Sequence, residues 1–381
     1  MIVLLAGLAC CTVSLAAPDE EALGKSRGYP TCPNSKGSFS PEWCLVGVTT
    51  HYHEIYPSRV VKKADSPRPL QRAAQEPAVG QDAFLAEHRN MGLLVMQGDT
   101  IHAERYQYER TAEHRFASMS MAKTVIGMLV GIALHEKKIK SLDDKAEAYV
   151  PGLKGHPYGE TPIRHLLTMT SGVRFEEIYS GRDDVMKLAT AILWQEGPGG
   201  AAAVLPYKER IAPPGQRWNY ASSETFVLAL VLRGAVGGDL SEYTSRVLWQ
   251  PMGAEFDAYW NIDPLGNELG YCCFSATLRD WARLGLLLAD GGAREGKQNI
   301  PADWVKAATS SQAPNPSYGY QTWVSSQGDR FHLRGRLGQA VWVHPATRTV
   351  VVHTSVYGIS GGAASITQGR FFDAVLQTLG K

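Results

Sequence analysis

The chain has 381 residues, of which 44% are hydrophobic and 20% charged, and its formal net charge is +1. This composition is typical of a globular protein with a large core and one or two domains. A charge so close to zero gives no reason to expect nucleic acid or another acidic polymer as a partner.

An apolar run at residues 2–17 precedes Pro18 and a short acidic stretch. Small residues at 14–16 are typical of a signal-peptide cleavage site, so we assign residues 1–16 to a leader and expect an exported protein. No basic residue precedes Lys25, which leaves an anchor in the membrane as an alternative. Lipidation at Cys10 fits less well, because Gly7 stands where a larger aliphatic residue is expected.

Four cysteines follow the leader, and export would allow them to form disulfides in any of three pairings. Cys32 and Cys44 make the simple local pair, whereas a bond between the neighbours Cys272 and Cys273 would be strained. The spacing fits no zinc-site pattern, so we predict neither a metal site nor a cofactor.

Residues 17–84 are rich in proline, serine, glycine and charge, which predicts an irregular extension that wraps the main body. Strands at 91–97 and 101–106, joined by Gly98-Asp99, form a predicted hairpin. The pattern predicts helices within 161–172 and over 278–288. The remaining predicted elements are strands at 318–324, 330–333, 340–344 and 349–355 and a helix near 363–379.

These elements predict a sheet assembled from both ends of the chain, residues 85–140 and 318–381. A mostly helical domain, residues 141–317, is inserted between them. The expected fold class is α/β (α+β), with an antiparallel sheet flanked by helices and a cleft between the two parts. The apolar stretch at 121–134 is too short for a membrane span and carries Lys123, so we expect no integral membrane domain.

A Ser-x-x-Lys pattern, Ser120 and Lys123, opens this apolar stretch. On a helix the two side chains share one face, about 5–6 Å apart at Cβ, so they can form a hydrogen bond. A serine hydroxyl needs a neighbouring base to act as a nucleophile. A free lysine, with a pKa of about 10.4, is protonated at neutral pH, but burial lowers that pKa by up to about 3–5 units. The all-round apolar helix predicts such burial, although Ser120 in isolation also fits a helix N-cap.

A second serine pattern, Gly-x-Ser-x-Gly, centres on Ser360. The nucleophile elbow that this pattern marks needs an acid and then a histidine later in the chain. Asp373 follows Ser360, but no histidine does. We therefore interpret these glycines as a turn between the last strand and the last helix.

Three further segments agree with Ser120 as the nucleophile: residues 163–172, 214–222 and 331–339. Together with Ser-x-x-Lys they resemble the serine beta-lactamase/penicillin-binding-protein superfamily, over roughly residues 85–381. The resemblance is to its class C and esterase branch, and most of all to the aminohexanoate-oligomer hydrolases. It implies a beta-lactamase/DD-peptidase-like fold.

The resemblance also implies residue roles. Ser120 is the nucleophile, Lys123 the general base and Tyr220 the residue that carries the proton to the leaving group. The backbone N–H groups of Ser120 and Arg336 form the oxyanion hole. The residues implied to contact substrate are Tyr179, Ser222, Arg334 and Gly335.

This chain departs from the family pattern at two of these positions. Ser222 stands where the family's Tyr-x-Asn motif has the asparagine, and 333–335 reads Leu-Arg-Gly instead of Lys-Thr-Gly. The resemblance therefore favours a serine hydrolase of small esters or linear amides over a beta-lactamase. The alternatives are a beta-lactamase or a D-amino-acid peptidase acting on cell-wall peptides, and a non-catalytic binding protein. The oligomeric state is not predicted.

Overall fold

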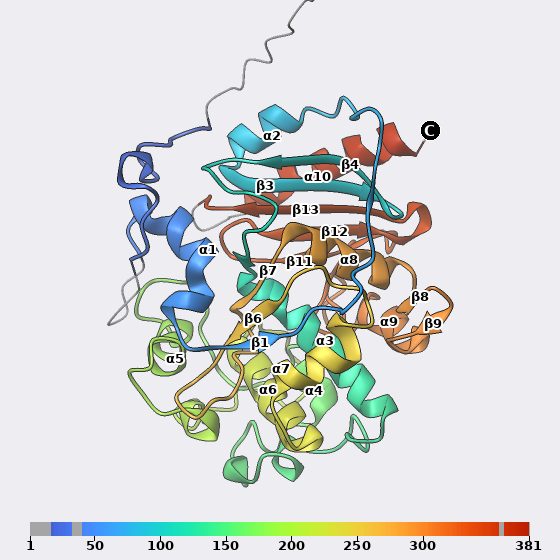
Figure 1. Cartoon of the computed structure of the whole chain (residues 1–381). Coiled ribbons are helices and arrows are strands. Elements are labelled where there is room, and N and C mark those ends of the chain that lie inside the picture. The colour runs from blue at the N-terminus through green and yellow to red at the C-terminus, as the bar shows by residue number, and fades with distance from the viewer. Residues whose placement is uncertain (1–16, 33–39, 358–361, 381) are drawn as a thin grey trace, which may run out of the picture.

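The computed structural model describes residues 17–32, 40–357 and 362–380 (Figure 1). Its largest sheet has seven strands in the order β10-β11-β12-β13-β3-β4-β2, antiparallel except where β2 runs parallel to β4. The strands are β2 (Gln71–Arg72), β3 (Asn90–Gln97), β4 (Thr100–Tyr106), β10 (Trp323–Val324), β11 (Phe331–Arg334), β12 (Ala340–His344) and β13 (Thr349–Ser355). The sheet is thus built from both ends of the chain, and the predicted hairpin is confirmed as β3 and β4.

The central strands β3 and β13 are buried on both faces, and alternate residues enter different cores. Val350 and Val352 belong to the main core, whereas Val351 packs with Phe371 and Phe372. The main-core face is covered by α8 (Leu278–Ala289), and the other face by α2 (Gln81–Glu87) and α10 (Gly362–Leu379) (Figure 1). This two-residue alternation follows from the pleat of a strand and fixes the register of the sheet.

The mostly helical part of the molecule packs around α3 (Ala122–His135), which is buried from Ala122 to Ala133. Neighbouring elements in contact with α3 include α6 (Ser222–Val236) and α9 (Ala302–Ala308). Contact with α9 is so close that a Cβ on Gly131 would lie 2.2 Å from the Trp304 ring. The other elements of this part are α4 (Ile163–Leu167), α5 (Asp184–Ile192), α7 (Leu240–Thr244), the π-helix Ser245–Trp249 and the hairpin β8 (Ala293–Arg294) and β9 (Lys297–Gln298).

A small antiparallel sheet lies beneath the start of α3. Its order is β1-β6-β7-β5, formed by β1 (Ser58–Val61), β5 (Phe116–Ala117), β6 (Ala258–Asn261) and β7 (Phe274–Ala276). The strands β6 and β7 come from the region predicted to be mostly helical, and β1 comes from the N-terminal extension. This sheet therefore joins three parts of the sequence that the predicted organisation kept separate.

The N-terminal extension differs from the irregular segment predicted. It contains α1 (Leu45–Ile55), which buries Val46, Val48 and Tyr52 and packs on β5 and β6 (Figure 1). The end of this helix is fixed by Asn261, whose amide donates to the carbonyl oxygens of Tyr52 (3.1 Å) and Tyr56 (3.0 Å). The prediction of an irregular segment rested on the average composition of residues 17–84, which does not reveal so short an apolar stretch.

Two predicted elements are shorter than expected. The strand predicted at 318–324 is confined to Trp323–Val324, because the backbone N–H of Gln321 donates to Leu167 (3.0 Å) and its carbonyl accepts from Thr124 (2.8 Å). Gln321 therefore bonds to the end of α4 and to α3, and Tyr318 pairs with Trp323 only through an isolated β-bridge. The helix expected within 161–172 covers only Ile163–Leu167.

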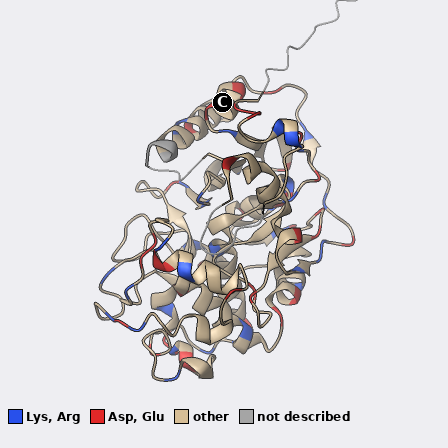
Figure 2. Cartoon of the chain, turned by 90° about the vertical axis from the view of Figure 1, so that its left-hand side faces the viewer, with Lys and Arg blue, Asp and Glu red and all other residues tan. Residues whose placement is uncertain are grey.

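Basic and acidic residues are interspersed over the face shown in Figure 2. Within the described ranges, no helix is both long enough and apolar enough to cross a membrane. The predicted leader at 1–16 and the segment 358–361, which holds Ser360, lie outside the described residues.

Candidate active site

Ser120 lies in a 3-10 turn, Met119–Met121, that leads directly into α3. Two hydrogen bonds tie this turn to β7: the Ser118 N–H donates to the Phe274 carbonyl (2.9 Å), and the Phe274 N–H donates to Ser118 Oγ (3.1 Å). Met119 has φ 44°, in the left-handed region that residues other than glycine rarely adopt. Such conformations persist where the surroundings enforce them, often at functional sites.

Lys123 is 1% exposed, and its Nζ lies 3.0 Å from Ser120 Oγ. Burial lowers the pKa of this ammonium to about 8, against the opposing charge of Glu177. Lys123 therefore loses its proton far more readily than a lysine in water, as the sequence pattern predicts. The one-turn spacing from Ser120 and the apolar helix together produce this environment.

The remaining partners of Lys123 decide which way its lone pair points. Nζ lies 3.1 Å from Ser222 Oγ and 3.0 Å from the Tyr271 carbonyl oxygen. Ser222 donates its own hydroxyl proton to the Glu177 carboxylate (2.9 Å), which in its ionised form can only accept. Ser222 Oγ and the Tyr271 carbonyl are thus both acceptors for Lys123. A neutral amine has two N–H groups, so both are used and the lone pair is left for the Ser120 hydroxyl.

Ser222 was predicted to contact the substrate, but the structure places it elsewhere. Its side chain is 1% exposed and lies behind Lys123. Glu177, which sequence reasoning missed as a functional residue, accepts from the Ser222 N–H (2.7 Å), the Ser222 hydroxyl and the Tyr179 hydroxyl (2.8 Å). Its place in the loop before Tyr179 was the only available signal, because its two contacts with Ser222 span 45 residues of sequence.

Tyr220 lines the same cavity as Ser120 and lies beside Lys123. Burial and the Glu177 charge raise the pKa of its phenol, while a hydrogen bond to the Ser120 side chain and the charge of Arg334 act in the other direction. The ring stacks on Trp323 with a centroid distance of 5.6 Å, and Lys123 Nζ lies 4.9 Å from the ring centroid. Tyr220 is thus a protonated phenol held beside both the nucleophile and the base.

A small cavity over Ser120 brings together several residues that the sequence predicted. It is lined by Ser120, Tyr179, Tyr220, Trp323, Arg334, Gly335 and Arg336. A Cβ on Gly335 would lie 2.8 Å from the Ser118 carbonyl oxygen, so glycine allows the end of β11 to approach the nucleophile turn. The Arg336 guanidinium lies 4.9 Å from the centroid of the Tyr179 ring. An oxyanion hole formed by the Ser120 and Arg336 N–H groups stays a prediction.

A family model described as beta-lactamase matches residues 82–357, well over half of the chain. The chain belongs to the beta-lactamase family. Within this family, it is 26% identical to the 6-aminohexanoate-dimer hydrolase of Paenarthrobacter ureafaciens over 361 residues, which covers 87% of this chain and 89% of that protein. Family membership and this relative identify the chain as a serine hydrolase.

Two further comparisons extend this result. Penicillin-binding protein 4* of Bacillus subtilis is 26% identical over 179 residues, covering 43% of this beta-lactamase-family chain and 36% of that protein. A solved structure from Bacillus anthracis, named as a candidate 6-aminohexanoate-dimer hydrolase, superposes with a TM-score of 0.79 at 23% identity. It covers 95% of this chain and 98% of that chain. This similarity confirms the predicted fold and, at that identity, the fold alone.

Proposed function

We propose that the protein hydrolyses small esters or linear amides through an acyl-enzyme, with Ser120 as nucleophile, Lys123 as general base and Tyr220 as proton carrier. One observation supports this most strongly: both N–H groups of a neutral Lys123 have acceptors, so its lone pair is directed at Ser120. The proposed role accounts for the chain of hydrogen bonds that links Ser120, the buried Lys123, Ser222 and the half-buried Glu177.

The proposed reaction begins when Ser120 Oγ bonds to the substrate carbonyl carbon and its proton passes to Lys123 Nζ. Negative charge develops on the carbonyl oxygen, which the N–H groups of Ser120 and Arg336 would stabilise. Tyr220 donates its proton to the leaving oxygen or nitrogen as that bond breaks, and the Lys123 ammonium restores the phenol proton. In the second half, water adds to the acyl carbon, gives a proton to Lys123, and Ser120 Oγ leaves and regains its proton.

The test is hydrolysis of p-nitrophenyl acetate by the wild type, Ser120→Ala and Ser360→Ala, together with mass spectrometry after fluorophosphonate treatment. We expect Ser120→Ala to lose turnover and the label to be on Ser120, while Ser360→Ala remains active. Loss of activity in Ser360→Ala alone would contradict the proposal. Rapid, stable acylation by a penicillin, without ester turnover, would instead favour the penicillin-binding alternative.

We also propose that the protein is exported. Support comes from the apolar leader and from the pairing of Cys32 with Cys44 and of Cys272 with Cys273, since disulfides persist in oxidising compartments. Thiol titration of the denatured mature protein is expected to find no free thiol. Four reactive thiols would contradict both pairings.

A further inference from the structure

A second pocket opens beside Ser120, and Tyr220 does not line it. It shares Ser120, Tyr179 and Arg336 with the cavity described above, but Tyr220 and Trp323 do not line it. In the proposed mechanism, which this inference extends, the leaving atom must lie near the Tyr220 hydroxyl. The leaving group therefore lies toward Trp323 and Arg334, and the acyl group of the substrate points into this second pocket.

The wall of the acyl pocket is formed largely by α5 and the two residues after it. Val185, Met186 and Leu193 are at most 4% exposed and line the pocket with Ala189 and Trp194. The N-terminal extension contributes Tyr52 from α1, so a segment outside the match to the family model helps to shape this site. Most of the surface that an acyl group would meet is apolar.

The charges around the acyl pocket oppose a cationic acyl group. None of its lining residues carries a carboxylate, and all of them belong to the described part of the chain. The one charged lining side chain is the cationic Arg336. The indole N–H of Trp194 can only donate a hydrogen bond, and within the described residues it has no acceptor. An ammonium group would lose its hydration there without gaining an anionic partner.

Another part of the pocket wall is the disulfide between Cys272 and Cys273, since both residues line the pocket. The backbone on either side is anchored: the Cys273 carbonyl accepts from the Asn261 N–H (3.1 Å), and the Cys272 carbonyl accepts from Trp260 Nε1 (3.3 Å). The preceding residue, Tyr271, supplies the carbonyl that accepts from Lys123. The sulfur pair thus presents a polarisable, uncharged surface directly beside the base.

We propose that the Cys272–Cys273 disulfide and the α5 wall form an acyl-specificity pocket that selects an apolar acyl group without a positive charge. The substrate class is then esters or amides of medium-chain or aromatic carboxylic acids. Cationic amino-acyl compounds are disfavoured, because the pocket provides no carboxylate. The disulfide acts as a specificity-determining surface, and reduction or replacement changes which acyl groups are accepted.

The test compares kcat/KM for p-nitrophenyl esters that differ only in the acyl group. Wild type is expected to prefer hexanoate to acetate by at least about tenfold, since each buried methylene in an apolar pocket discriminates measurably. It is also expected to prefer the 7,7-dimethyloctanoate ester to its cationic counterpart, 6-(trimethylammonio)hexanoate, by about tenfold or more. These two acyl groups have the same shape, so the ratio of their kcat/KM values reports the effect of charge alone.

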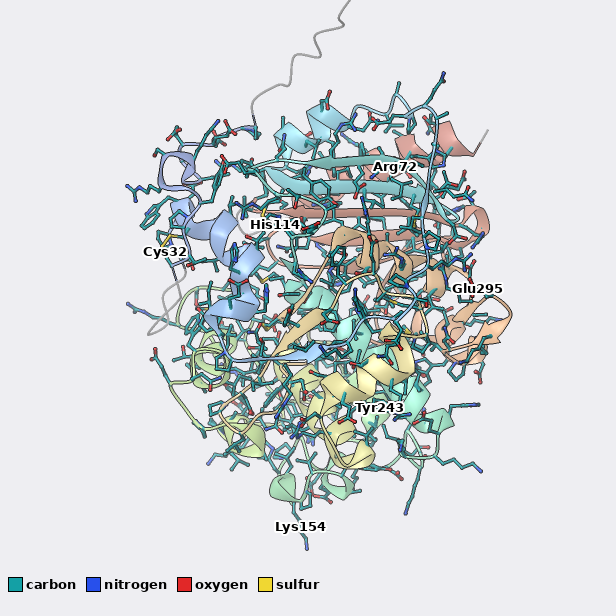
Figure 3. All side chains as sticks on the ribbon, viewed as in Figure 1. Cys32, Arg72, His114, Lys154, Tyr243 and Glu295 are labelled. Carbon is teal, nitrogen blue, oxygen red and sulfur yellow. A yellow bond between two sulfur atoms is a disulfide. The ribbon has the colours of Figure 1, made fainter. Side chains whose placement is uncertain are left out.

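The variant Cys272→Ser/Cys273→Ser is expected to lower the hexanoate-to-acetate ratio at least about threefold. The matched control, Cys32→Ser/Cys44→Ser, removes the disulfide at the periphery beside α1, where Figure 3 labels Cys32, and is expected to keep the wild-type ratio. Each ratio is measured on one preparation, so loss of folded protein does not change it. Val185→Thr, which keeps the shape and adds a hydroxyl, is expected to lower the ratio as well and serves if the double variant does not fold.

Equal turnover of the cationic and neutral esters would overturn the inference, as would an unchanged ratio in Cys272→Ser/Cys273→Ser and Val185→Thr. Failure of the proposed function gives a different result. In that case Ser120→Ala hydrolyses every ester as fast as wild type. If turnover depends on Ser120 but shows no acyl preference, the proposed function stands and the specificity pocket is wrong.

Discussion

Lys123 on α3 and Glu224 on α6 are both buried ionisable residues, and the difference in their surroundings favours a catalytic role for Lys123 alone. Burial lowers the pKa of the lysine to about 8 and raises the pKa of the carboxyl to about 8, so burial favours the neutral form of each. Glu224 is fully buried, accepts a hydrogen bond from the Ser171 hydroxyl (2.6 Å) and lines none of the cavities described above.

Lys123 differs from Glu224 in access and in orientation. Its neighbour Ser120 is partly exposed and lines two cavities, and the remaining Lys123 contacts direct its lone pair toward that hydroxyl. A perturbed pKa alone is therefore insufficient to identify a catalytic group. The lone pair of a catalytic base must also face the hydroxyl of the nucleophile, and a substrate must be able to reach that hydroxyl.

The largest effect expected from this comparison is on catalysis. Lys123→Met removes the base but keeps an apolar chain of similar length, so kcat/KM for p-nitrophenyl acetate is expected to fall roughly 1,000-fold. Glu224→Gln, the matched change at the other buried group, is expected to keep kcat/KM within about twofold, because it touches no reacting atom. A Lys123→Met enzyme that retains a tenth of the wild-type rate would show that another group acts as the base.

The next effect is the pH dependence of the rate. The proposed base acts only when deprotonated, and its pKa is about 8. We therefore expect kcat/KM to rise as pH increases through about 8 and to fall about tenfold for each pH unit below that value. A pH–rate profile of the wild type between about pH 5 and 10 measures this. A flat profile through that range would contradict a titrating Lys123.

A smaller effect is expected at Glu177, which positions Ser222 and, through it, Lys123. Glu177→Gln removes the acceptor-only carboxylate, so Ser222 is no longer forced to accept from Lys123, and kcat/KM is expected to fall about 10–100-fold. The Glu177 charge also raises the Lys123 pKa, so its removal is expected to move the limb of the pH–rate profile to lower pH. The exposed neighbour Glu176→Gln is the control and is expected to leave the limb in place. An unchanged limb in Glu177→Gln would assign Glu177 a purely structural role.

Effects on stability are also expected, and they have opposite signs at the two buried groups. The folded pKa of Glu224 is raised, so its contribution to the free energy of unfolding is present below about pH 4.5 and is lost as pH rises toward 8. The folded pKa of Lys123 is lowered, so stability increases as pH rises from about 8 to 10.5.

Urea unfolding at several pH values tests this contrast. Glu224→Gln is expected to reduce the loss of stability between about pH 4.5 and 8 by a few kcal/mol. Lys123→Met is expected to raise stability at about pH 7, because it removes the cost of burying an ammonium. If the free energy of unfolding of both variants shows the same pH dependence as that of the wild type, that result would contradict a shifted pKa for either group in the folded protein.

Local sequence patterns predicted a large share of this molecule. The hairpin β3–β4, the strands β12 and β13 and the helix α8 lie where strand-like apolar runs, a hairpin signal and helical periodicity predicted them. The pairing of Ser120 with Lys123 was also predictable, because residues three apart on a helix are neighbours whatever else surrounds them. The roles of Tyr179, Tyr220, Arg334, Gly335 and Arg336 came from the family resemblance, and the structure gathers these residues around one cavity.

Other features depended on the tertiary structure. Ser222 contacts Lys123 across 99 residues, and the Tyr271 carbonyl does so across 148. No local pattern specifies such contacts, since they arise only when α6, β7 and α3 pack together. The same applies to Glu177, to Tyr52 in the acyl pocket and to the short strand β10. The sequence by itself predicted the proposed nucleophile, its proposed base and the positions of the main strands. Tertiary packing decided the order of those strands, the contacts of the Lys123 amine and the residues that line the pockets beside Ser120.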